Sequence, residues 1–167
     1  RMVLVPSTLA SLEAELRDPA DLAEVIRMEV SDGWPPELYD RDPIEFTIRR
    51  FQHFPDEALW WLYYFVLKPE GARPETAIGC GGFKGPPSAD GTVEIGYSIV
   101  PHHRRQGLAT EAALGLVAHA FAHDDVQRVI AETLPDLHAS IGVLEKCGFR
   151  FIGTGSAEGI IRYERLR

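Results

Sequence analysis

The sequence has 167 residues, 45% of them hydrophobic, and a formal net charge of -8. This length and apolar content predict one domain over residues 1–167 with its own core. The acidic balance disfavours a nucleic-acid partner and favours a cationic ligand. Cys80 and Cys147 lack the spacing of a zinc site or disulfide framework, which is typical of a reducing compartment. We therefore expect the cytoplasm. No run is long and apolar enough to span a bilayer, so no membrane partner is expected.

The first half of the chain predicts a short strand at Met2 to Val5, followed by helices and further strands. Polar and apolar residues mix up to about Glu29, which indicates one or two helices that "SDGWPPE" ends. A further helix is expected from Pro43 to Phe51. The aromatic and β-branched run from Leu59 to Leu67 predicts a buried strand. Thr76 to Phe83 predicts the next strand, and its three glycines indicate a bulge or a close approach of two backbones.

The second half predicts a strand, a helix and a parallel strand. Thr92 to Val100 alternates apolar residues on one face and completes an antiparallel meander with the two preceding strands. Helical spacing follows from Gly107 to His123, and then a strand from Arg128 to Leu134. A crossover helix normally makes its two strands parallel, and ligands bind beyond their carboxyl ends. Helix His138 to Cys147 and a terminal hairpin, Phe149 to Thr154 with Ile160 to Leu166, complete a mixed α/β fold with mostly antiparallel strands.

The stretch "VPHHRRQGLATE" places positive charge where the long helix begins. A helix N-terminus is already partly positive, so Arg104 and Arg105 are unfavourable neighbours unless an anion lies over the first turn. Gly107 and Ala109 leave the backbone amides uncovered, which favours such an anion site. The alternative is that both arginines extend into water.

The residues "RRQGLA" resemble the Q/R-x-x-G-x-G/A signature of the GNAT superfamily of acyl-CoA-dependent N-acyltransferases. The segments "VEIGYSIVPHHRRQGLATEAA" and "IAETLPDLHASIGVLEKCGF" resemble its acetyl-CoA-binding core, especially in the ribosomal-protein N-terminal acetyltransferase branch. The resemblance covers Thr76 to Gly153 well and the first fifty residues loosely. It implies a GNAT-like sheet with a splayed parallel strand pair and flanking helices.

The resemblance also implies a site for acetyl-CoA. Backbone amides from Gln106 to Thr110 would hold the pyrophosphate, Arg104 and Arg105 would add charge, and pantetheine would hydrogen-bond along Ile99 and Val100. The expected cofactor-binding residues are Ile99, Val100, Arg104, Arg105, Gln106, Gly107, Leu108, Ala109, Thr110 and His138.

Two positions depart from the pattern of many relatives. His138 stands where they have Asn, and Leu144 stands where they have a Tyr that protonates the departing thiolate. Leu144 cannot donate a proton. Ser140 is therefore the candidate acid, as often in the branch resembled. The alternative is that Ser140 only caps or packs within its helix.

The chemistry requires a neutral amine, and a carboxylate that accepts its proton assists the reaction. Glu94 is the leading candidate because it interrupts an apolar strand, where burial would raise its pKa. The alternative is a cross-strand ion pair. Asp32, Trp34 and Glu37 lie in a segment that resembles the family's substrate lid and are the expected acceptor-binding residues, with Asp32 and Glu37 as secondary candidates for the base.

The sequence thus predicts an N-acetyltransferase that transfers acetyl directly to a primary amine in a ternary complex. The acceptor is a small molecule or a protein N-terminus, expected to be cationic and to meet the acidic segment Asp21 to Glu45. His119 and His123 lack a zinc motif, so no metal is expected. We expect a monomer or homodimer. The alternatives are a catalytically silent acyl-CoA-binding regulatory module and an unrelated phosphate or nucleotide binder.

Overall fold

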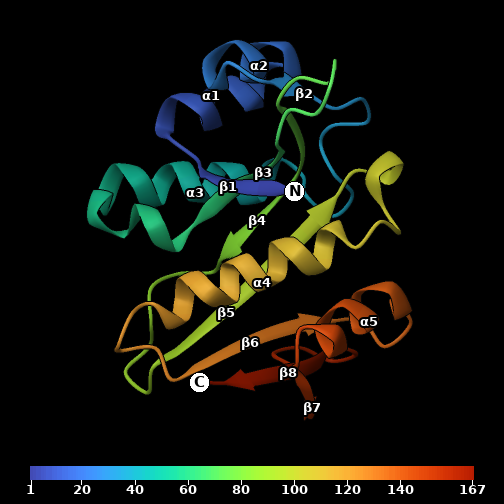
Figure 1. The fold of residues 1–167 in the computed structure, drawn as a ribbon. Coiled ribbons are helices and arrows are strands. Elements are labelled where there is room, and N and C mark those ends of the chain that lie inside the picture. Colours follow the sequence, from blue (N-terminus) through green and yellow to red (C-terminus); the bar gives the residue numbers. More distant parts are fainter.

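The computed structural model describes residues 1–167 and contains one eight-stranded mixed sheet with helices on both faces (Figure 1). The strands are β1 (Met2–Pro6), β2 (Glu29–Val30), β3 (Leu62–Leu67), β4 (Thr76–Phe83), β5 (Thr92–Ile99), β6 (Arg128–Thr133), β7 (Arg150–Thr154) and β8 (Ile161–Leu166). Their order across the sheet is β1-β3-β4-β5-β6-β8-β7, and β2 adds a short parallel pairing to β4. All other neighbours are antiparallel except β5 and β6.

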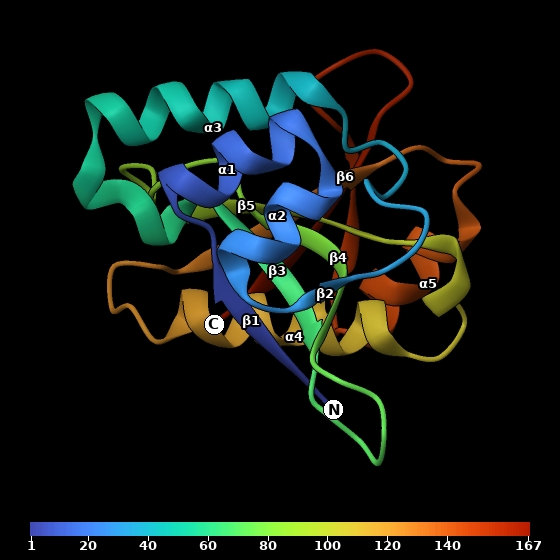
Figure 2. The same cartoon turned by 90° about the horizontal axis from the view of Figure 1, so that it is seen from above.

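Five α-helices cover the sheet in two layers. They are α1 (Leu9–Arg17), α2 (Pro19–Ile26), α3 (Arg41–His53), α4 (Leu108–Phe121) and α5 (His138–Lys146). Helices α1 to α3 lie on one face, and α4 and α5 lie on the other (Figure 2). Each layer of helices packs on its own apolar cluster, because successive side chains of a strand point to opposite faces of the sheet. In β3, Tyr63 belongs to the cluster on the α4 side and Tyr64 to the cluster on the α1 side. The expected mixed α/β class is confirmed.

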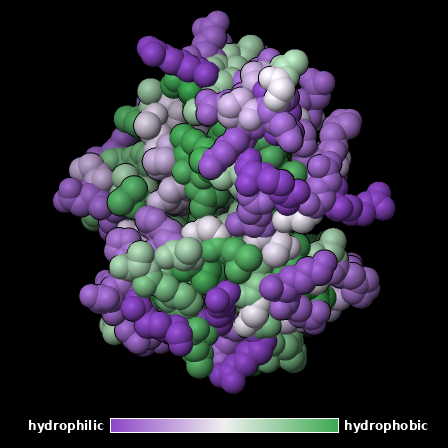
Figure 3. Space-filling model, viewed as in Figure 1, coloured by the Kyte–Doolittle hydropathy of each residue, from purple (hydrophilic) through white to green (hydrophobic).

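The longest helix, α4, has 14 residues, and none of the helices combines the length and apolarity that crossing a bilayer requires. Its alanine and leucine side chains also reach the surface, where hydrophobic residues gather across the middle of the face shown in Figure 3. Leu114, on this helix, is 41% exposed.

Local chemistry explains where the first helices begin. Thr8 caps α1 with a reciprocal pair of hydrogen bonds: Thr8 Oγ1 accepts from Ser11 N at 3.1 Å, and Ser11 Oγ accepts from Thr8 N at 2.9 Å. Asp18 then caps α2 by accepting from Ala20 N at 2.7 Å, with Pro19 in the first turn. The prediction of one or two helices before Glu29 is confirmed as two.

Two expectations for the first half need correction. The strand expected from Leu59 begins at Leu62, because Pro55–Trp60 forms a 3₁₀-helix. The short strand β2 was not expected at all, since two residues carry no periodicity. The close backbone approach predicted for the glycines of β4 is confirmed. A Cβ on Gly79 would lie 2.3 Å from Ser98 O, and a Cβ on Gly81 would lie 2.3 Å from Gly96 O.

The predicted parallel pair opens part of the way along its length. Thr92 to Ile95 of β5 pair with Arg128 to Ala131 of β6, and the register ends there. Beyond that point β5 continues beside β4 to Ile99, whereas β6 continues beside β8. The carboxyl halves of β5 and β6 are therefore not hydrogen-bonded to each other, and we call their separation the opening between β5 and β6. Helix α4 begins just beyond β5 (Figure 1).

Candidate active site

The turn before α4 presents a run of backbone N–H groups that the protein itself does not use. The first helical hydrogen bond of α4 runs from Glu111 N to Gly107 O at 3.1 Å. The N–H groups from Arg105 to Thr110 take part in no hydrogen bond within the protein, and no side chain caps the helix. Free N–H groups at a helix N-terminus favour an anionic ligand, because the helix dipole adds to their partial positive charge.

The conformation of this turn keeps the approach to these N–H groups open. Arg105 and Gly107 both have left-handed backbone angles, with φ of 59° and 78°. Turn conformations of this kind can direct successive N–H groups to a common side and so form an anion-binding concavity. A Cβ on Gly107 would meet only Arg1 Nη2, at 3.5 Å. We call residues Arg104 to Gly107 the α4 loop.

The Arg104 side chain links the α4 loop to the end of β5 and to Glu37. Its Nε donates to Ile99 O at 2.8 Å, and its Nη1 lies 2.8 Å from Glu37 Oε2. The expectation that Arg104 adds charge to a bound pyrophosphate stays a prediction, although two of its three guanidinium nitrogens already bind the protein. Arg105 is exposed and has no ion-pair partner, so it is the arginine available to an anion.

The backbone of β5 at the opening is only partly free. Val100 N donates to Ile78 O at 2.9 Å, and Val100 O accepts from His103 N at 3.1 Å. Both backbone groups of Val100 thus already take part in hydrogen bonds within the protein, and its contact with pantetheine stays a prediction. Antiparallel ladders alternate, so the backbone groups of Tyr97 and Ile99 point away from β4, toward the opening. The Ile99 carbonyl already accepts from Arg104, which leaves Ile99 N–H and both groups of Tyr97.

Glu94 lies on the face of β5 opposite α4, at the point where β6 begins to diverge. Val93 and Ile95 pack into the cluster on the α4 side, so the alternating residues Glu94 and Gly96 face the other way. The Glu94 side chain is 19% exposed, and Oε1 forms an ion pair with Lys84 Nζ that is not aligned as a hydrogen bond. The cross-strand ion pair, one of the two readings of the sequence, is present.

Open space lies beside this carboxylate. A Cβ on Gly96 would have no atom within 4 Å, and Gly96 is the next residue of β5 on the same face. Since β6 no longer pairs with β5 at this level, the gap adjoins the opening. A substrate group has room here without displacing a side chain.

Helix α5 carries Ser140 next to the opening. The hydroxyl of Tyr97 donates to Ser140 O at 3.4 Å and so links β5 to the first turn of α5. Burial raises the pKa of Tyr97 to about 12, so its hydroxyl keeps its proton near neutral pH. Leu144 is buried in the core, where its apolar side chain packs. His138 is exposed at the start of the helix.

The three expected acceptor residues lie in the segment Ser31 to Asp40, which we call the lid loop. Trp34 Nε1 donates to Glu15 Oε1 at 2.8 Å, and its ring packs at 6.1 Å from that of Tyr64. Glu37 pairs with Arg104, and its carbonyl accepts from Ser98 Oγ at 2.7 Å. Asp32 is exposed and has no ion-pair partner.

Sequence reasoning missed three residues that shape this region. Gly96 leaves the gap beside Glu94, Tyr97 reaches α5, and Glu15 holds Trp34. Gly96 and Tyr97 could have been noticed in the sequence, because a glycine and a tyrosine stand out in the middle of a strand with alternating burial. Glu15 gave no signal, because its partners are 19 and 49 residues away.

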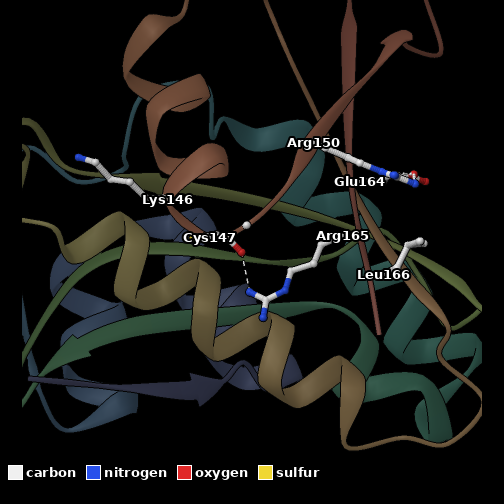
Figure 4. A pocket seen from close by; sticks show the side chains of 7 residues that line it. Lys146, Cys147, Arg150, Glu164, Arg165 and Leu166 are labelled. Carbon is white, nitrogen blue, oxygen red and sulfur yellow. Dashed lines mark hydrogen bonds and ion pairs between the residues drawn. The ribbon is translucent and has the colours of Figure 1, made fainter.

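A separate surface depression of about 560 Å³ lies at the far end of α5 (Figure 4). Lys146, Arg150 and Arg165 give it a basic lining, and Arg165 donates to Cys147 O. Arg150 also pairs with the buried carboxylate of Glu164 at 2.7 Å. Ser140 stands about two turns away at the other end of the helix, so this depression is not part of the opening between β5 and β6.

The sequence is similar to bacterial proteins described as uncharacterized N-acetyltransferases. One is YjdG of Bacillus subtilis, 39% identical over 72 residues that span 43% of each chain. Another is YoaA of the same organism, 34% identical over 85 residues that span 51% of this chain and 45% of YoaA. The matched segments thus span less than half of the length of either relative.

The fold is similar to that of solved acetyltransferases. These include an acetyltransferase from Agrobacterium tumefaciens (TM-score 0.67, 20% identity, 100% and 91% of the two chains), aminoglycoside acetyltransferase AAC(6')-Ib with coenzyme A and kanamycin (0.65, 17%, 100% and 95%), and the ribosomal-protein acetyltransferase RimL with coenzyme A (0.65, 18%, 99% and 93%). The acetyltransferase (GNAT) domain family matches residues 7–150. The chain belongs to the GNAT acetyltransferase family.

Proposed function

We propose that the protein is an acetyl-CoA-dependent N-acetyltransferase that transfers the acetyl group directly to a primary amine. The observation that carries this proposal is the coincidence of two features: the unused N–H groups of the α4 loop and helix start, and the opening between β5 and β6 directly beside them. An elongated ligand with an anionic end fits both at once. Family membership and the coenzyme A complexes of AAC(6')-Ib and RimL support the same ligand.

The residues present suit the coenzyme A moiety. The N–H groups of Gln106 to Thr110 hold the pyrophosphate, and Arg105, with Arg104 beside it, adds positive charge. Along the opening, Ile99 N–H and the backbone of Tyr97 are free to bond the pantetheine arm as a partial extra strand. His138, at the start of α5, contacts the same arm.

Acetyl-CoA supplies an activated acetyl group as a thioester. The amine nitrogen attacks the thioester carbonyl, a C–N bond forms and the C–S bond breaks. The amine proton passes to Glu94, directly or through water in the space beside Gly96. The thiolate receives a proton from a hydroxyl, for which Ser140 is our first assignment; the hydroxyl regains a proton from solvent, to which Glu94 releases the amine proton. The hydroxyl of Tyr97, which contacts the Ser140 carbonyl, is the second.

The acceptor enters beside the lid loop, where Asp32, Trp34 and Glu37 lie. The relatives in similar folds include enzymes named for aminoglycosides and for ribosomal proteins, so both a small cationic amine and a protein N-terminus are acceptor classes to test. The segment Asp21 to Glu45 holds eight acidic residues, of which Asp21, Glu37 and Glu45 are ion-paired within the protein. The remaining carboxylates attract a cationic amine, and the apparent affinity for it falls as salt rises. A salt-insensitive affinity contradicts this steering.

A second candidate function is a catalytically silent acyl-CoA-binding module, and the Glu94–Lys84 ion pair is the observation that favours it. A lysine on the carboxylate opposes its role as a base. Turnover of acetyl-CoA with a panel of small amines, polyamines and peptides with free N-termini separates the two functions. Acetylation of any of these amines supports the enzyme. Coenzyme A binding without turnover of any supports the silent module.

Calorimetry with coenzyme A, ATP and NAD tests the nature of the ligand. The proposal predicts binding of coenzyme A and weaker binding of the other two. Equal binding of all three supports a general phosphate or nucleotide binder instead. We also place the protein in the cytoplasm, because both cysteines are free thiols.

A further inference from the structure

Glu15 is a buried carboxylate with only neutral partners. It lies on α1, is 8% exposed, and faces the sheet. Its Oε1 accepts from Trp34 Nε1 at 2.8 Å, and its Oε2 accepts from the Tyr64 hydroxyl at 2.9 Å. A buried carboxylate usually has a cation nearby, because removing a charge from water is costly. Glu15 has none at ion-pair distance.

The stability of the fold does not explain this residue. Burial raises the pKa of Glu15 to about 7, while the hydrogen bonds from Trp34 and Tyr64 act in the opposite direction. The carboxyl is therefore partly ionised near neutral pH, in a place where ionisation opposes folding. A neutral side chain of the same shape would fold more favourably.

What Glu15 holds is the lid loop. Trp34 lies in the first half of this loop, and its indole nitrogen has Glu15 as its hydrogen-bond partner. Tyr39 lies near its end and is buried, with a hydroxyl that has no hydrogen-bond partner. Burial raises the pKa of Tyr39, and so does the nearby charge of Glu15.

The other end of this arrangement reaches the opening between β5 and β6. Glu37, between Trp34 and Tyr39, is tied to Ser98 of β5 and to Arg104 of the α4 loop. Tyr64, Cys80 and Ser98 are cross-strand neighbours on β3, β4 and β5, so Glu15 stands over the same row of the sheet as Ser98. The lid loop is thus fixed at one point by α1 and at another by the candidate site.

We propose that Glu15 is a positioning residue for acceptor binding, because its carboxylate fixes Trp34 and thereby the lid loop beside the opening between β5 and β6. The inference rests on the proposed function for the identity of the acceptor site. A carboxylate accepts stronger hydrogen bonds than a neutral carbonyl, so ionised Glu15 holds the loop more tightly than a protonated or amide side chain. The titratable or polar groups that face Glu15 are Ser11 on α1, Tyr64 on β3, Cys80 on β4, and Trp34 and Tyr39 in the lid loop. All are neutral near pH 7, so ionisation of Glu15 itself controls the contact.

Hydrogen exchange of the lid-loop amides tests the anchor without any substrate. Glu15→Gln removes the charge and keeps the shape, and Trp34→Phe removes the donor and keeps the ring. Glu13→Gln is the matched control, because Glu13 lies on the same helix and is exposed. At pH 8 we expect the lid loop to exchange about five- to tenfold faster in Glu15→Gln and Trp34→Phe, as the loss of a charge-assisted bond implies. Glu13→Gln should match the parent protein. Parental exchange in both test variants overturns the anchor.

Steady-state kinetics then test the role in acceptor binding. Glu15→Gln is expected to raise the acceptor KM about five- to tenfold, with the KM for acetyl-CoA unchanged and kcat nearly so. The double variant Glu15→Gln/Trp34→Phe should be no worse than either single variant, since both break the same contact. A faster-exchanging lid loop with a parental acceptor KM contradicts the inference. If no amine is acetylated by the parent protein, the proposed function fails, and the exchange experiment still decides whether Glu15 holds the loop.

Discussion

Arg104 Nη1 lies 2.8 Å from Glu37 Oε2, and this ion pair joins the α4 loop to the lid loop. Both side chains are at least one-third exposed, so the pair contributes little to overall stability. Its importance is geometric. One guanidinium holds the end of β5 through Ile99 O and the lid loop through Glu37, so the proposed coenzyme A site and the proposed acceptor site share a residue.

The shared arginine predicts linked effects of substitution. Arg104→Ala removes the brace from both loops, and we expect about a fivefold weaker coenzyme A affinity and a raised acceptor KM. Glu37→Gln leaves the bond from Arg104 to Ile99 in place, so it should raise the acceptor KM alone. Calorimetry and steady-state kinetics on both variants check this. An Arg104→Ala protein that loses coenzyme A affinity but keeps the parental acceptor KM would contradict the coupling.

Glu94→Gln is expected to lower kcat by about a hundredfold or more near pH 7, with coenzyme A affinity nearly intact. The defect should narrow as the pH approaches the pKa of the amine, because an amine that loses its proton to water no longer needs the carboxylate. A pH series of kcat measures this.

Lys84→Gln is the control for that experiment, because it breaks the same ion pair and leaves the carboxylate. If Glu94 is a base, Lys84→Gln retains most of the parental kcat. If Glu94 serves only the ion pair, both variants should lose melting temperature alike and keep the parental kcat, and the base is then a lid-loop carboxylate or water.

The hydroxyls of Ser140 and Tyr97 both lie near the start of α5, and removing one or the other is expected to lower kcat differently. Ser140→Ala should lower kcat if Ser140 protonates the thiolate, whereas Tyr97→Phe should lower it if the phenol does, because it deletes only the hydroxyl. The group whose removal lowers kcat about tenfold or more at unchanged KM for acetyl-CoA is the donor. Parental kcat in both variants would leave the proton transfer to water.

The raised pKa of Glu15 predicts how stability depends on pH. The folded protein holds this proton up to a pKa of about 7, whereas the unfolded chain releases it near 4.5. Between these values the folded state binds more protons, so the contribution of Glu15 to the free energy of unfolding falls as the pH rises. The loss approaches about 3 kcal/mol above pH 7 as an upper figure.

Urea unfolding of the parent and Glu15→Gln at pH 5 and pH 8 measures this contribution. The amide variant lacks the titration, so it should gain stability relative to the parent as the pH rises. A difference between the two proteins that stays constant with pH would mean that Glu15 does not titrate in this range.

How much the sequence predicts differs between the fold and the site. Periodicity and turn residues locate α4, α5, β4 and β6 within one or two residues, because each is a local pattern of burial. The signature at Arg104 to Ala109 locates the uncapped start of α4, which we propose binds an anion, because a left-handed glycine before a helix is also a local feature.

Contacts between residues that are far apart in the chain could not be predicted from the sequence. The sequence leaves two interpretations of Glu94 open, because its partner Lys84 lies directly after the neighbouring strand β4. It also does not show that Arg104 turns toward Ile99 and Glu37. The predicted strand begins earlier than β3 does, because Leu59 and Trp60 are apolar in a 3₁₀-helix as they would be in a strand. Pairings of charged side chains depend on the packing of whole elements, which no local pattern records.

Calorimetric binding of coenzyme A to a Gly107→Val variant tests the central claim most directly. Gly159→Val is the matched control, because Gly159 has the same φ of 78°, open space around its Cβ and a position outside the site. Both substitutions impose similar backbone strain, so only the approach to the N–H groups differs. The account predicts that Gly159→Val binds coenzyme A as the parent does and that Gly107→Val loses most of its affinity. A folded Gly107→Val protein with parental affinity for coenzyme A would contradict the assignment of the α4 loop as the acetyl-CoA site.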